Sequence, residues 1–513
     1  MTGWTSRIII LSLLGIVIGV PLVLSAKHDA AANEGRDANA ARLIIFSPHN
    51  EQIRYELTRA YNLWRAAKEL PAVEIDWRTS GGSSDLRKQI LDQFNGKAMV
   101  GREDDGIGAD LFFGGGEYEH NKLVGGVTVD RDGGMVRIPV SVPIILPDGF
   151  RDEAFPSQTI GGELLYHSDF YWFGAALSSF GIVYNQDLVR MRSAPEPRTW
   201  TDLEHPAFDG WIALADPGHS GSAGATYNVI VRRNGWDEGW RSIRRIFANS
   251  RYFTAGATKV PVDVSAGEAA AGMAIDFYGR FQAGAIGGDR IGYSDPPGMT
   301  AITSDPISIL RGAPRPELAL EFVVFVLSRE GQQLWQKRVG TPGGPERFEL
   351  RRLPVRRDLY TPSHMADWVD QVHPFDEARA MAPGVPDYYF AIAPIAHAMA
   401  IDIHDDLSAA WRTLRAHEGQ PVYAEMEQLF YAMPDALTIT WPDDELRANW
   451  QTIAEDPTHT RFDELKDLLK THIGSVYGRW SGDQKEKDRI NWTRFFQGNY
   501  RKIVKLGKET PAS

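Results

Sequence analysis

The sequence predicts an α/β fold of two lobes, each built on a doubly wound sheet, followed by a mainly helical C-terminal extension. Short apolar runs alternate with amphipathic helical segments along residues 42–150 and again along 170–303, which is typical of α/β units. Most of these runs end in a loop rich in glycine and serine. From about residue 360 a helical spacing of apolar residues takes over, and the strand-and-loop pattern does not recur.

The first 27 residues differ in character from the rest of the chain. Arg7 precedes an apolar run from Ile8 to Leu24 that ends in small residues. This pattern is typical of a secretory signal peptide, and the run is also long enough for a retained N-terminal anchor. Either interpretation places the chain beyond residue 27 in the periplasm or at the extracytoplasmic face. Residues 28–41 are predicted to be a linker because they are rich in alanine, asparagine and aspartate.

The composition excludes several classes of function. The chain of 513 residues has a formal net charge of −12, which argues against a general nucleic-acid binder because such proteins present a basic face. It has no cysteine, so disulfides, thiolate metal ligands and cysteine nucleophiles are excluded. The glycine loops lack the lysine of a nucleotide-hydrolysing P-loop, and no Gly-x-Ser-x-Gly motif occurs. We therefore expect no enzymatic activity and no cofactor.

The first lobe is predicted to follow the order β-α-β-α-β, with a loop after each strand. Its predicted elements are strands at 43–46, 73–77 and 109–113, a helix capped by Asn50, and a helix after the loop 79–85. Residues 304–358, which include an amphipathic helix from Pro316, are predicted to return to this lobe and complete it.

The middle of the chain is predicted to cross between the lobes. Residues 136–146 and 170–184 are long extended segments with few helical signals between them. Together with the return of the chain after residue 303, they give two or more crossings. Such connections are typical of a hinged clamshell.

The second lobe is predicted to repeat the α/β pattern. A strand at 211–215 precedes helices at about 221–233 and 236–249. In the stretch 259–280 the alternating Val260, Val262 and Val264 predict a short extended segment, and Ser265 is expected to cap a turn of helix. A buried strand at 272–275 then follows.

The loops that follow the strands supply the candidate ligand contacts. Side chains just past the carboxyl end of a buried strand face the crevice where open α/β sheets bind ligands. The loops 80–84 and 219–223 both open helices, so their N–H groups and hydroxyls favour an anion; for the first loop the alternative is plain helix capping by Ser83 or Ser84. The candidate ligand-binding residues are His49, Ser80, Gly81, Ser83, Ser84, Gly115, Gly116, Glu117, Ser220, Gly221, Ser222, Asp276 and Tyr278.

Several segments, taken in order, resemble one protein family. They read FSPHNE, SGGSSDLRKQI, ADLFFGGGEYEHNKL, SSFGIVYNQDL, TWTDL, ADPGHSGSAGATYNVI, VPVDVSAGEAAAGMAIDFYGR and DPISILRGAPRPELALEFVVFVLSREGQQLW. This order resembles the family 1 extracellular solute-binding proteins of ABC importers, in the ferric-iron group that also includes binders of phosphate-bearing organic anions. The resemblance covers residues 42–358. It implies the fold of a type II periplasmic binding protein, a clamshell of two lobes. It also implies that the protein is a monomer without enzymatic activity, which binds a small solute and delivers it to a membrane permease.

The resemblance leaves three kinds of solute open. In the ferric-iron relatives a histidine, a glutamate and two adjacent tyrosines hold the metal, and His49, Glu117 and Tyr278 stand in comparable places. Phe277 replaces one tyrosine and cannot ligate a metal, so an organic anion is favoured over Fe(III). The third kind is a cationic solute, which would use Asp276, Glu117 and an aromatic face.

The C-terminal extension, residues 360–513, has no counterpart in the resemblance. With the apolar N-terminal run, it motivates an alternative function as a membrane-tethered sensor or scaffold. His397 and His404, near several aspartates, suggest either a metal cluster or a polar surface. The Lys/Arg-rich segment 485–508 is predicted to be a solvated face, and the alternative is contact with a partner or a membrane surface.

Overall fold

The computed structural model describes residues 41–481 and 485–510. The predicted signal peptide or anchor and most of the predicted linker lie outside these described residues. None of the described helices combines the length and the hydrophobicity that a bilayer crossing requires.

The first lobe is built on a six-stranded sheet in the order β2-β1-β3-β15-β6, with β9 also paired to β15. The strands are β1 (Ala41–Phe46), β2 (Val73–Arg78), β3 (Leu111–Phe113), β6 (Ser141–Val142), β9 (Phe173–Ser178) and β15 (Thr303–Leu310). β1 runs parallel to β2 and β3, whereas β15 is antiparallel to its three neighbours. The chain therefore returns after the second lobe to complete the first.

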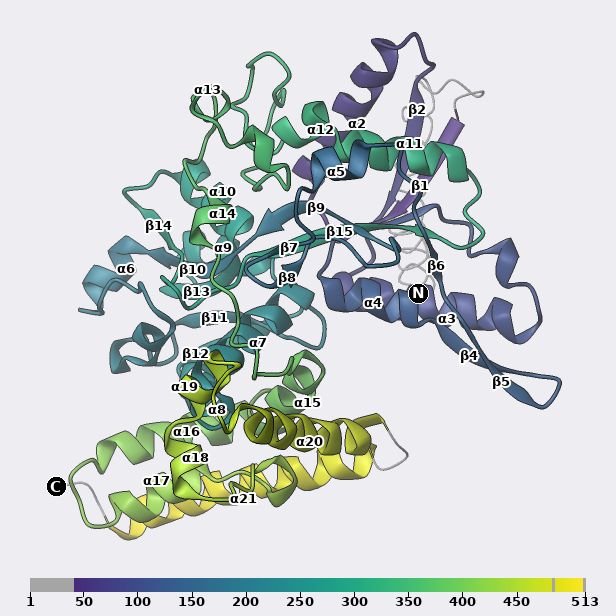
Figure 1. Cartoon of the computed structure of the whole chain (residues 1–513). Coiled ribbons are helices and arrows are strands. Elements are labelled where there is room, and N and C mark those ends of the chain that lie inside the picture. The colour runs from purple at the N-terminus through teal and green to yellow at the C-terminus, as the bar shows by residue number, and fades with distance from the viewer. Residues whose placement is uncertain (1–40, 482–484, 511–513) are drawn as a thin grey trace, which may run out of the picture.

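Helices cover both faces of this sheet (Figure 1). They are α2 (Glu51–Ala66), α3 (Ser83–Met99), α4 (Glu117–Gly125), α5 (Phe150–Ala154), α11 (Pro316–Leu327) and α12 (Arg329–Gln333). Side chains of a strand alternate between faces, so Leu43 and Ile45 join the core with α2 and α11, and Phe46 joins the core with α3 and α4. The Asn50 side chain accepts a hydrogen bond from the Ile53 N–H at 3.0 Å, which confirms the predicted cap.

Two small hairpins extend from the first lobe. They are β4 (Val127–Arg131) with β5 (Gly134–Ile138), and β7 (Thr159–Ile160) with β8 (Glu163–Leu164).

The second lobe is built on a five-stranded sheet in the order β12-β11-β13-β10-β14. Its elements are β10 (Phe180–Asn185), α6 (Gln186–Met191), β11 (Ile212–Ala215), α7 (Gly221–Asn234), α8 (Trp236–Ala248), β12 (Ser250–Thr254), α9 (Lys259–Ala266), β13 (Ala271–Ile275), α10 (Asp276–Ile286) and β14 (Ile291–Ser294). β11 is parallel to β12 and β13, and β10 is antiparallel to β13 and β14.

The lobes are connected where β9 passes into β10. Ser179 alone separates these strands, and each belongs to the sheet of a different lobe. The second lobe thus begins at β10 and not at residue 170. The segment 136–146 does not cross either, because it forms β5 and β6 and stays with the first lobe.

The prediction for residues 259–266 is wrong, because they form the helix α9. Val260 and Val264 lie one helical turn apart and are fully buried, whereas Val262 is 52% exposed. Val260 packs directly over Gly272 of β13, and this packing overrides the β-propensity of valine. Ser265 lies inside the helix and donates to the Val262 carbonyl at 2.8 Å, so it caps no helix start.

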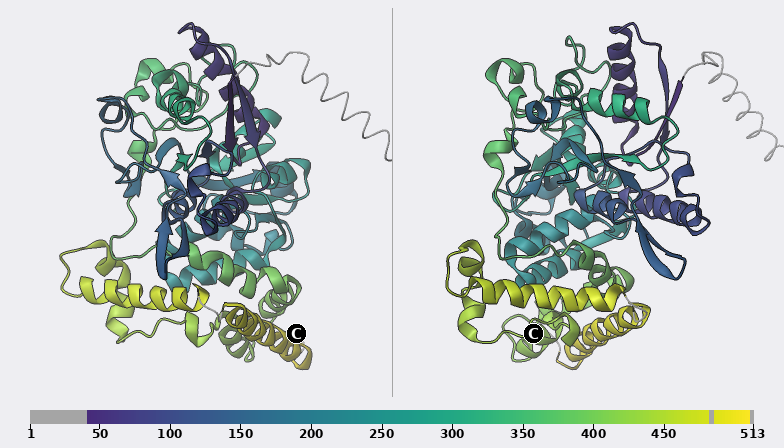
Figure 2. Two further views of the ribbon diagram at one scale, coloured as in Figure 1. Left: turned by 90° about the vertical axis from the view of Figure 1, so that its right-hand side faces the viewer. Right: turned by 45° about the vertical axis from the view of Figure 1, so that its right-hand side comes forward.

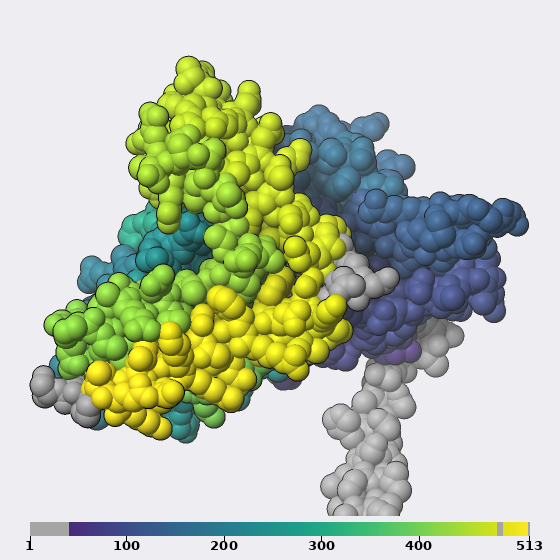
Figure 3. All heavy atoms as spheres, turned by 90° about the horizontal axis from the view of Figure 1, so that it is seen from below, coloured from purple at the N-terminus to yellow at the C-terminus, as the bar shows by residue number. Residues whose placement is uncertain are grey.

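The C-terminal extension is helical, as predicted. After the short elements η4 (Arg357–Leu359), α13 (Pro362–Met365) and α14 (Pro374–Glu377), it comprises α15 (Tyr389–Met399), α16 (His404–Ala416), α17 (Tyr423–Tyr431), α18 (Asp444–Ala448), α19 (Trp450–Glu455), α20 (Phe462–Ser481) and α21 (Lys485–Glu509). Figures 2 and 3 show helices α15 to α21 packed against the lower face of the second lobe, whereas α13 lies at the top of the molecule in Figure 1.

The extension and the second lobe share one hydrophobic core. α15 packs against α7, and α16 packs against α8. Trp240 and Phe247 of α8 belong to the same buried cluster as Ile395 of α15 and Phe496 of α21. The predicted solvated face at 485–508 is thus only one side of α21, whose other side carries Phe496 and Tyr500 into the core.

Candidate functional site

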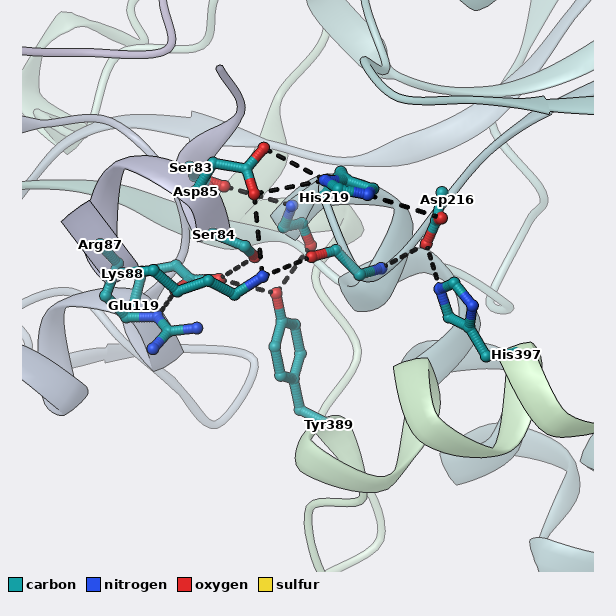
Figure 4. A network of polar contacts seen from close by, with 12 residues as sticks. Ser83, Ser84, Asp85, Arg87, Lys88, Glu119, Asp216, His219, Tyr389 and His397 are labelled. Carbon is teal, nitrogen blue, oxygen red and sulfur yellow. Dashed lines mark hydrogen bonds and ion pairs between the residues drawn. The ribbon is translucent and has the colours of Figure 1, made fainter. Parts of the chain in front are cut away.

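The two lobes touch each other through the loops that open α3 and α7 (Figure 4). The Gly221 N–H donates to the Ser83 hydroxyl at 3.2 Å. Lys88 Nζ donates to the Gly218 carbonyl at 3.1 Å, and His219 Nδ1 lies 3.3 Å from the Asp85 carboxylate. A side chain at position 82 would overlap the carbonyl oxygen of residue 219, so glycine is required there for the lobes to meet.

A cavity of about 510 Å³ lies between the lobes beside this contact. Most of the predicted ligand-binding residues line it, namely His49, Gly81, Ser83, Gly115, Gly116, Ser220, Gly221, Ser222 and Tyr278. These residues come from loops that are far apart in the sequence and that follow strands of both sheets.

The other predicted contacts point elsewhere. Ser80 is exposed and donates to Gln89 at 2.7 Å. Ser84 is buried, donates to Glu119 at 2.7 Å and does not line the cavity. Asp276 is fully buried beneath the cavity wall. The N-cap of α3 is Gly82, so neither Ser83 nor Ser84 caps this helix.

The starts of several helices face the cavity. The lining includes Asn50 before α2, Ser83 of α3, Gly116 before α4, and Gly221 of α7. N–H groups in the first turn of a helix lack partners within the helix, and the helix dipole is positive at this end. These helix starts therefore favour a negatively charged ligand group in the cavity.

The floor of the cavity is a buried network around His49. Its Nε2 lies 2.9 Å from Asp305 Oδ2 and 2.8 Å from Arg352 Nη1, while Nδ1 lies 3.0 Å from the Ser47 hydroxyl. Arg352 pairs with Asp305 and donates to Ser178 at 3.0 Å. Although burial opposes ionisation, Arg352 and His49 lower the pKa of Asp305 to about 2. Burial lowers the pKa of His49, whose two ring nitrogens are both engaged.

Arg54 gives the cavity its positive balance. It lies one turn into α2, lines the cavity and donates to the Asn50 carbonyl at 3.3 Å. Arg54 has no ion-pair partner among residues 41–481 and 485–510. The two carboxylates of the lining have cationic neighbours, because Asp305 pairs with Arg352 and Asp85 lies 3.7 Å from Lys88.

The stretch after β13 forms part of the cavity wall. Tyr278 lines the cavity, and burial raises the pKa of its phenol, so the hydroxyl is neutral at physiological pH. The Phe277 ring packs over the Arg352 guanidinium at 4.2 Å. Burial raises the pKa of Asp276 to about 7. Asp276 is fully buried and does not line the cavity.

A second cavity of about 310 Å³ adjoins the first, with which it shares Gly116, Ala225, Thr303 and Ser304. Glu117 lines this cavity together with Glu163, Asp387 and Tyr389. Burial, with a contribution from Glu163, raises the pKa of Glu117 to about 7. Glu117 does not line the first cavity.

The residues that the sequence suggested as possible metal ligands do not come together in the structure. Glu117 is in a different cavity from His49 and Tyr278. His397 contacts Asp216 and Asp402, whereas His404 contacts Ser250 and a backbone carbonyl. Within the described part of the chain, no three histidine or acidic side chains form a group suited to a metal ion.

Comparison with known proteins identifies the type of domain. Residues 154–355 match the model of a family described as bacterial extracellular solute-binding protein. This segment of the chain resembles an extracellular solute-binding domain. The chain's two-lobed architecture is similar to that of the periplasmic binding protein AfuA from Actinobacillus pleuropneumoniae, which was solved with fructose-6-phosphate bound. The two structures superpose with a TM-score of 0.52 at 16% sequence identity, over 72% of this chain and 97% of AfuA. The type II periplasmic-binding fold with a helical C-terminal region is thus confirmed.

Two curated relatives match shorter segments of the chain. The phosphoglycerate transport regulatory protein PgtC of Salmonella typhimurium is 23% identical over 159 residues, which are 31% of this chain and 39% of that protein. An uncharacterized protein of Haemophilus influenzae is 27% identical over 183 residues, 36% of this chain and 50% of that protein. The chain therefore spans half or less of the length of these relatives.

The site contains residues that the sequence did not predict. Asp305 and Arg352 meet His49 from more than 250 positions away in the chain, and no local pattern marks such a contact. Arg54 follows the cap residue Asn50 by four positions, which places it near the same helix end. That spacing was the available signal.

Proposed function

We propose that this protein is an extracytoplasmic receptor that captures a small anionic solute between its lobes and delivers it to an ABC permease in the membrane. The observation that carries this proposal is the cavity of about 510 Å³ at which several helix starts converge, together with Arg54. Its volume is in the range of small-molecule sites in proteins. The net charge of −12 does not oppose it, because local charges and dipoles set the potential in a cleft.

A phosphorylated solute is favoured among anions. AfuA was solved with fructose-6-phosphate, and PgtC takes its name from phosphoglycerate transport. A phosphate group accepts several hydrogen bonds at once, and the serine hydroxyls and first-turn N–H groups of α3 and α7 are donors suited to it. Ser83, Ser220 and Ser222 all line the cavity.

Ferric iron is a poorer candidate in this cavity. Fe(III) prefers phenolate, carboxylate and imidazole ligands. Of the candidate set, His49 is held by Asp305, Arg352 and Ser47. Phe277 replaces a phenolate, and Glu117 lies in the other cavity.

One observation favours a second function, that of a sensor. The extension contacts both lobes at their junction through Tyr389, so a change in lobe arrangement would reach the extension directly. In this proposal the N-terminal segment retains the protein at the membrane, whereas in the receptor proposal it is a signal peptide or a tether.

A thermal-shift panel tests the proposed solute class. The protein would be titrated with fructose 6-phosphate, a phosphoglycerate, inorganic phosphate, ferric citrate and putrescine. A bound anion at about 100 times its Kd should stabilise the folded state by about 2.7 kcal/mol. Native mass spectrometry of the purified protein would identify a retained solute. Stabilisation by iron with a visible charge-transfer band that Tyr278→Phe removes, and none by any anion, would replace the proposal.

A further inference from the structure

The extension places one side chain at the junction of the two lobes. The hydroxyl of Tyr389, the first residue of α15, lies 3.1 Å from the Gly221 carbonyl of the second lobe and 3.3 Å from Glu119 Oε1 of the first (Figure 4). Both partners accept, so the hydroxyl shares its single proton between them. Burial, followed by the nearby carboxylate of Glu119, raises the pKa of Tyr389, which keeps that proton in place.

Tyr389 is thereby connected to both loops that open onto the solute cavity. Glu119 is fully buried, accepts from Ser84 at 2.7 Å and pairs with Arg87. On the other side, Gly221 uses its N–H to bind Ser83 at 3.2 Å. A continuous chain of hydrogen bonds thus runs from the start of α3 through Tyr389 to the start of α7.

The tyrosine ring also packs between the lobes. It lies against the ring of Tyr118 of α4, with centroids 4.3 Å apart and planes inclined by 32°. A side chain at position 224 would come within 3.1 Å of the Tyr389 ring, so glycine leaves the space for it. Elsewhere on α4, the Lys122 ammonium lies 5.8 Å from the ring centre of Tyr477 in the extension.

The extension is attached to the second lobe, so these contacts with α4 depend on the position of the first lobe. Helices α15 to α21 share the core of the second lobe, whereas Val372 and Phe375 pack against the first lobe. His397 of α15 lies 3.0 Å from Asp216. An opening motion at the β9–β10 connection would separate α4 from α15 and break the contacts of Tyr389 with Tyr118 and Glu119.

We propose that Tyr389 is a positioning residue that latches the lobes in their closed arrangement. The helical extension acts with it as a third element of the clamshell, which stabilises closure from behind the solute cavity. If the latch holds the lobes closed, the bound solute is released more slowly, and this consequence rests on the proposed function. The latch itself depends only on the contacts between the two lobes.

Distance measurements between the lobes in the full chain test the latch. The protein has no cysteine, so Met99→Cys in the first lobe and Met191→Cys in the second, at positions 71% and 77% exposed, would carry a fluorescent donor and acceptor. Single-molecule energy transfer then measures the ratio of closed to open molecules. Four forms of the labelled protein would be compared. They are the protein with Tyr389 unchanged, Tyr389→Phe, Tyr389→Ala, and the control Tyr423→Phe on α17 of the extension.

We expect Tyr389→Phe to lower the closed-to-open ratio about five-fold, which corresponds to the loss of one hydrogen bond. Tyr389→Ala should lower it further because the ring contact is lost as well, and Tyr423→Phe should leave it unchanged. If Tyr389→Ala does not fold, Tyr118→Leu tests the ring contact from the first lobe. With a solute that binds, its dissociation rate should rise by the same factor as the closed-to-open ratio falls.

The proposal would be overturned if the closed-to-open ratio stayed within about two-fold of the native value in folded Tyr389→Phe and in the variant that removes the ring contact, Tyr389→Ala or Tyr118→Leu. A native protein that never reaches the closed distance, with or without the anion panel, would also overturn it. Failure of every anion to bind would contradict the proposed function but would leave the change in ratio measurable, so the two failures are distinguishable.

Discussion

The two lobes contribute different things to the same cleft. The first lobe has a hydrophobic core on each face of its sheet, one of which also includes Phe277 of the second lobe. It supplies His49, Arg54, Asp85 and Asp305 to the cavity. Both lobes supply N–H groups and hydroxyls, but the second lobe adds the aromatic rings of Phe180, Phe277 and Tyr278 and no charged side chain, and it shares its core with the extension. We infer that the first lobe selects the charge of the solute, whereas the second, together with the extension, controls closure.

The largest expected effect comes from a substitution in the core that the second lobe shares with the extension. Phe496 of α21 is fully buried and lies 5.1 Å from the Arg244 guanidinium of α8. Phe496→Ala should destabilise the protein by about 3–5 kcal/mol because it leaves a cavity in the core. Hydrogen exchange should then rise together in α8 and in the extension, with the first lobe least affected.

The matched control is Phe322→Ala in α11, which is equally buried in the first lobe. Its effect on exchange should centre on the sheet of the first lobe. If the extension exchanges faster after Phe496→Ala while α8 keeps its protection, the two do not form one cooperative unit, and the contrast between the lobes is incorrect.

Charge selection by the first lobe is tested at Arg54. Arg54→Gln should weaken binding of a phosphorylated solute about 10- to 100-fold, because a hydrogen bond to a charged group contributes about 1.5–3 kcal/mol. Isothermal titration calorimetry measures the change. The control is Arg59→Gln on the same helix, whose guanidinium pairs with Glu346 at 2.8 Å and does not line the cavity. Equal losses in both variants would show that Arg54 has no specific role.

The smallest expected effect is a pH dependence where α15 joins the second lobe. Although burial opposes protonation, Asp216 and Asp402 raise the pKa of His397. The stabilisation by protonated His397 is therefore complete below its ordinary pKa of about 6.5 and is lost as pH rises through the raised value. His397→Gln should cost about 1 kcal/mol at pH 6 and should flatten the dependence. Melting temperatures from pH 5.5 to 8.5 measure this, and parallel curves for both proteins would contradict it.

Much of the fold follows from local sequence patterns, and its exceptions have a physical reason. The apolar runs at 43–46, 211–215 and 272–275 form strands within one or two residues of the predicted bounds. The prediction of an extended segment at 259–266 is wrong because the spacing of the valines is ambiguous. Alternating valines fit a strand, and valines four positions apart also fit the buried face of a helix. Contacts with β13 decide between these two in favour of α9.

The sequence by itself determined the strands, the helix cap at Asn50, the glycine and serine loops after the strands, and the resemblance to solute-binding proteins. Each of these depends on residues that are neighbours in the chain. Only the tertiary structure decided that Asp305 and Arg352 engage His49, that Glu117 lies in a separate cavity, and that Tyr389 lies at the lobe junction. Such contacts depend on how the sheets, the helices and the extension pack together to bury their apolar faces, and no local pattern contains that information.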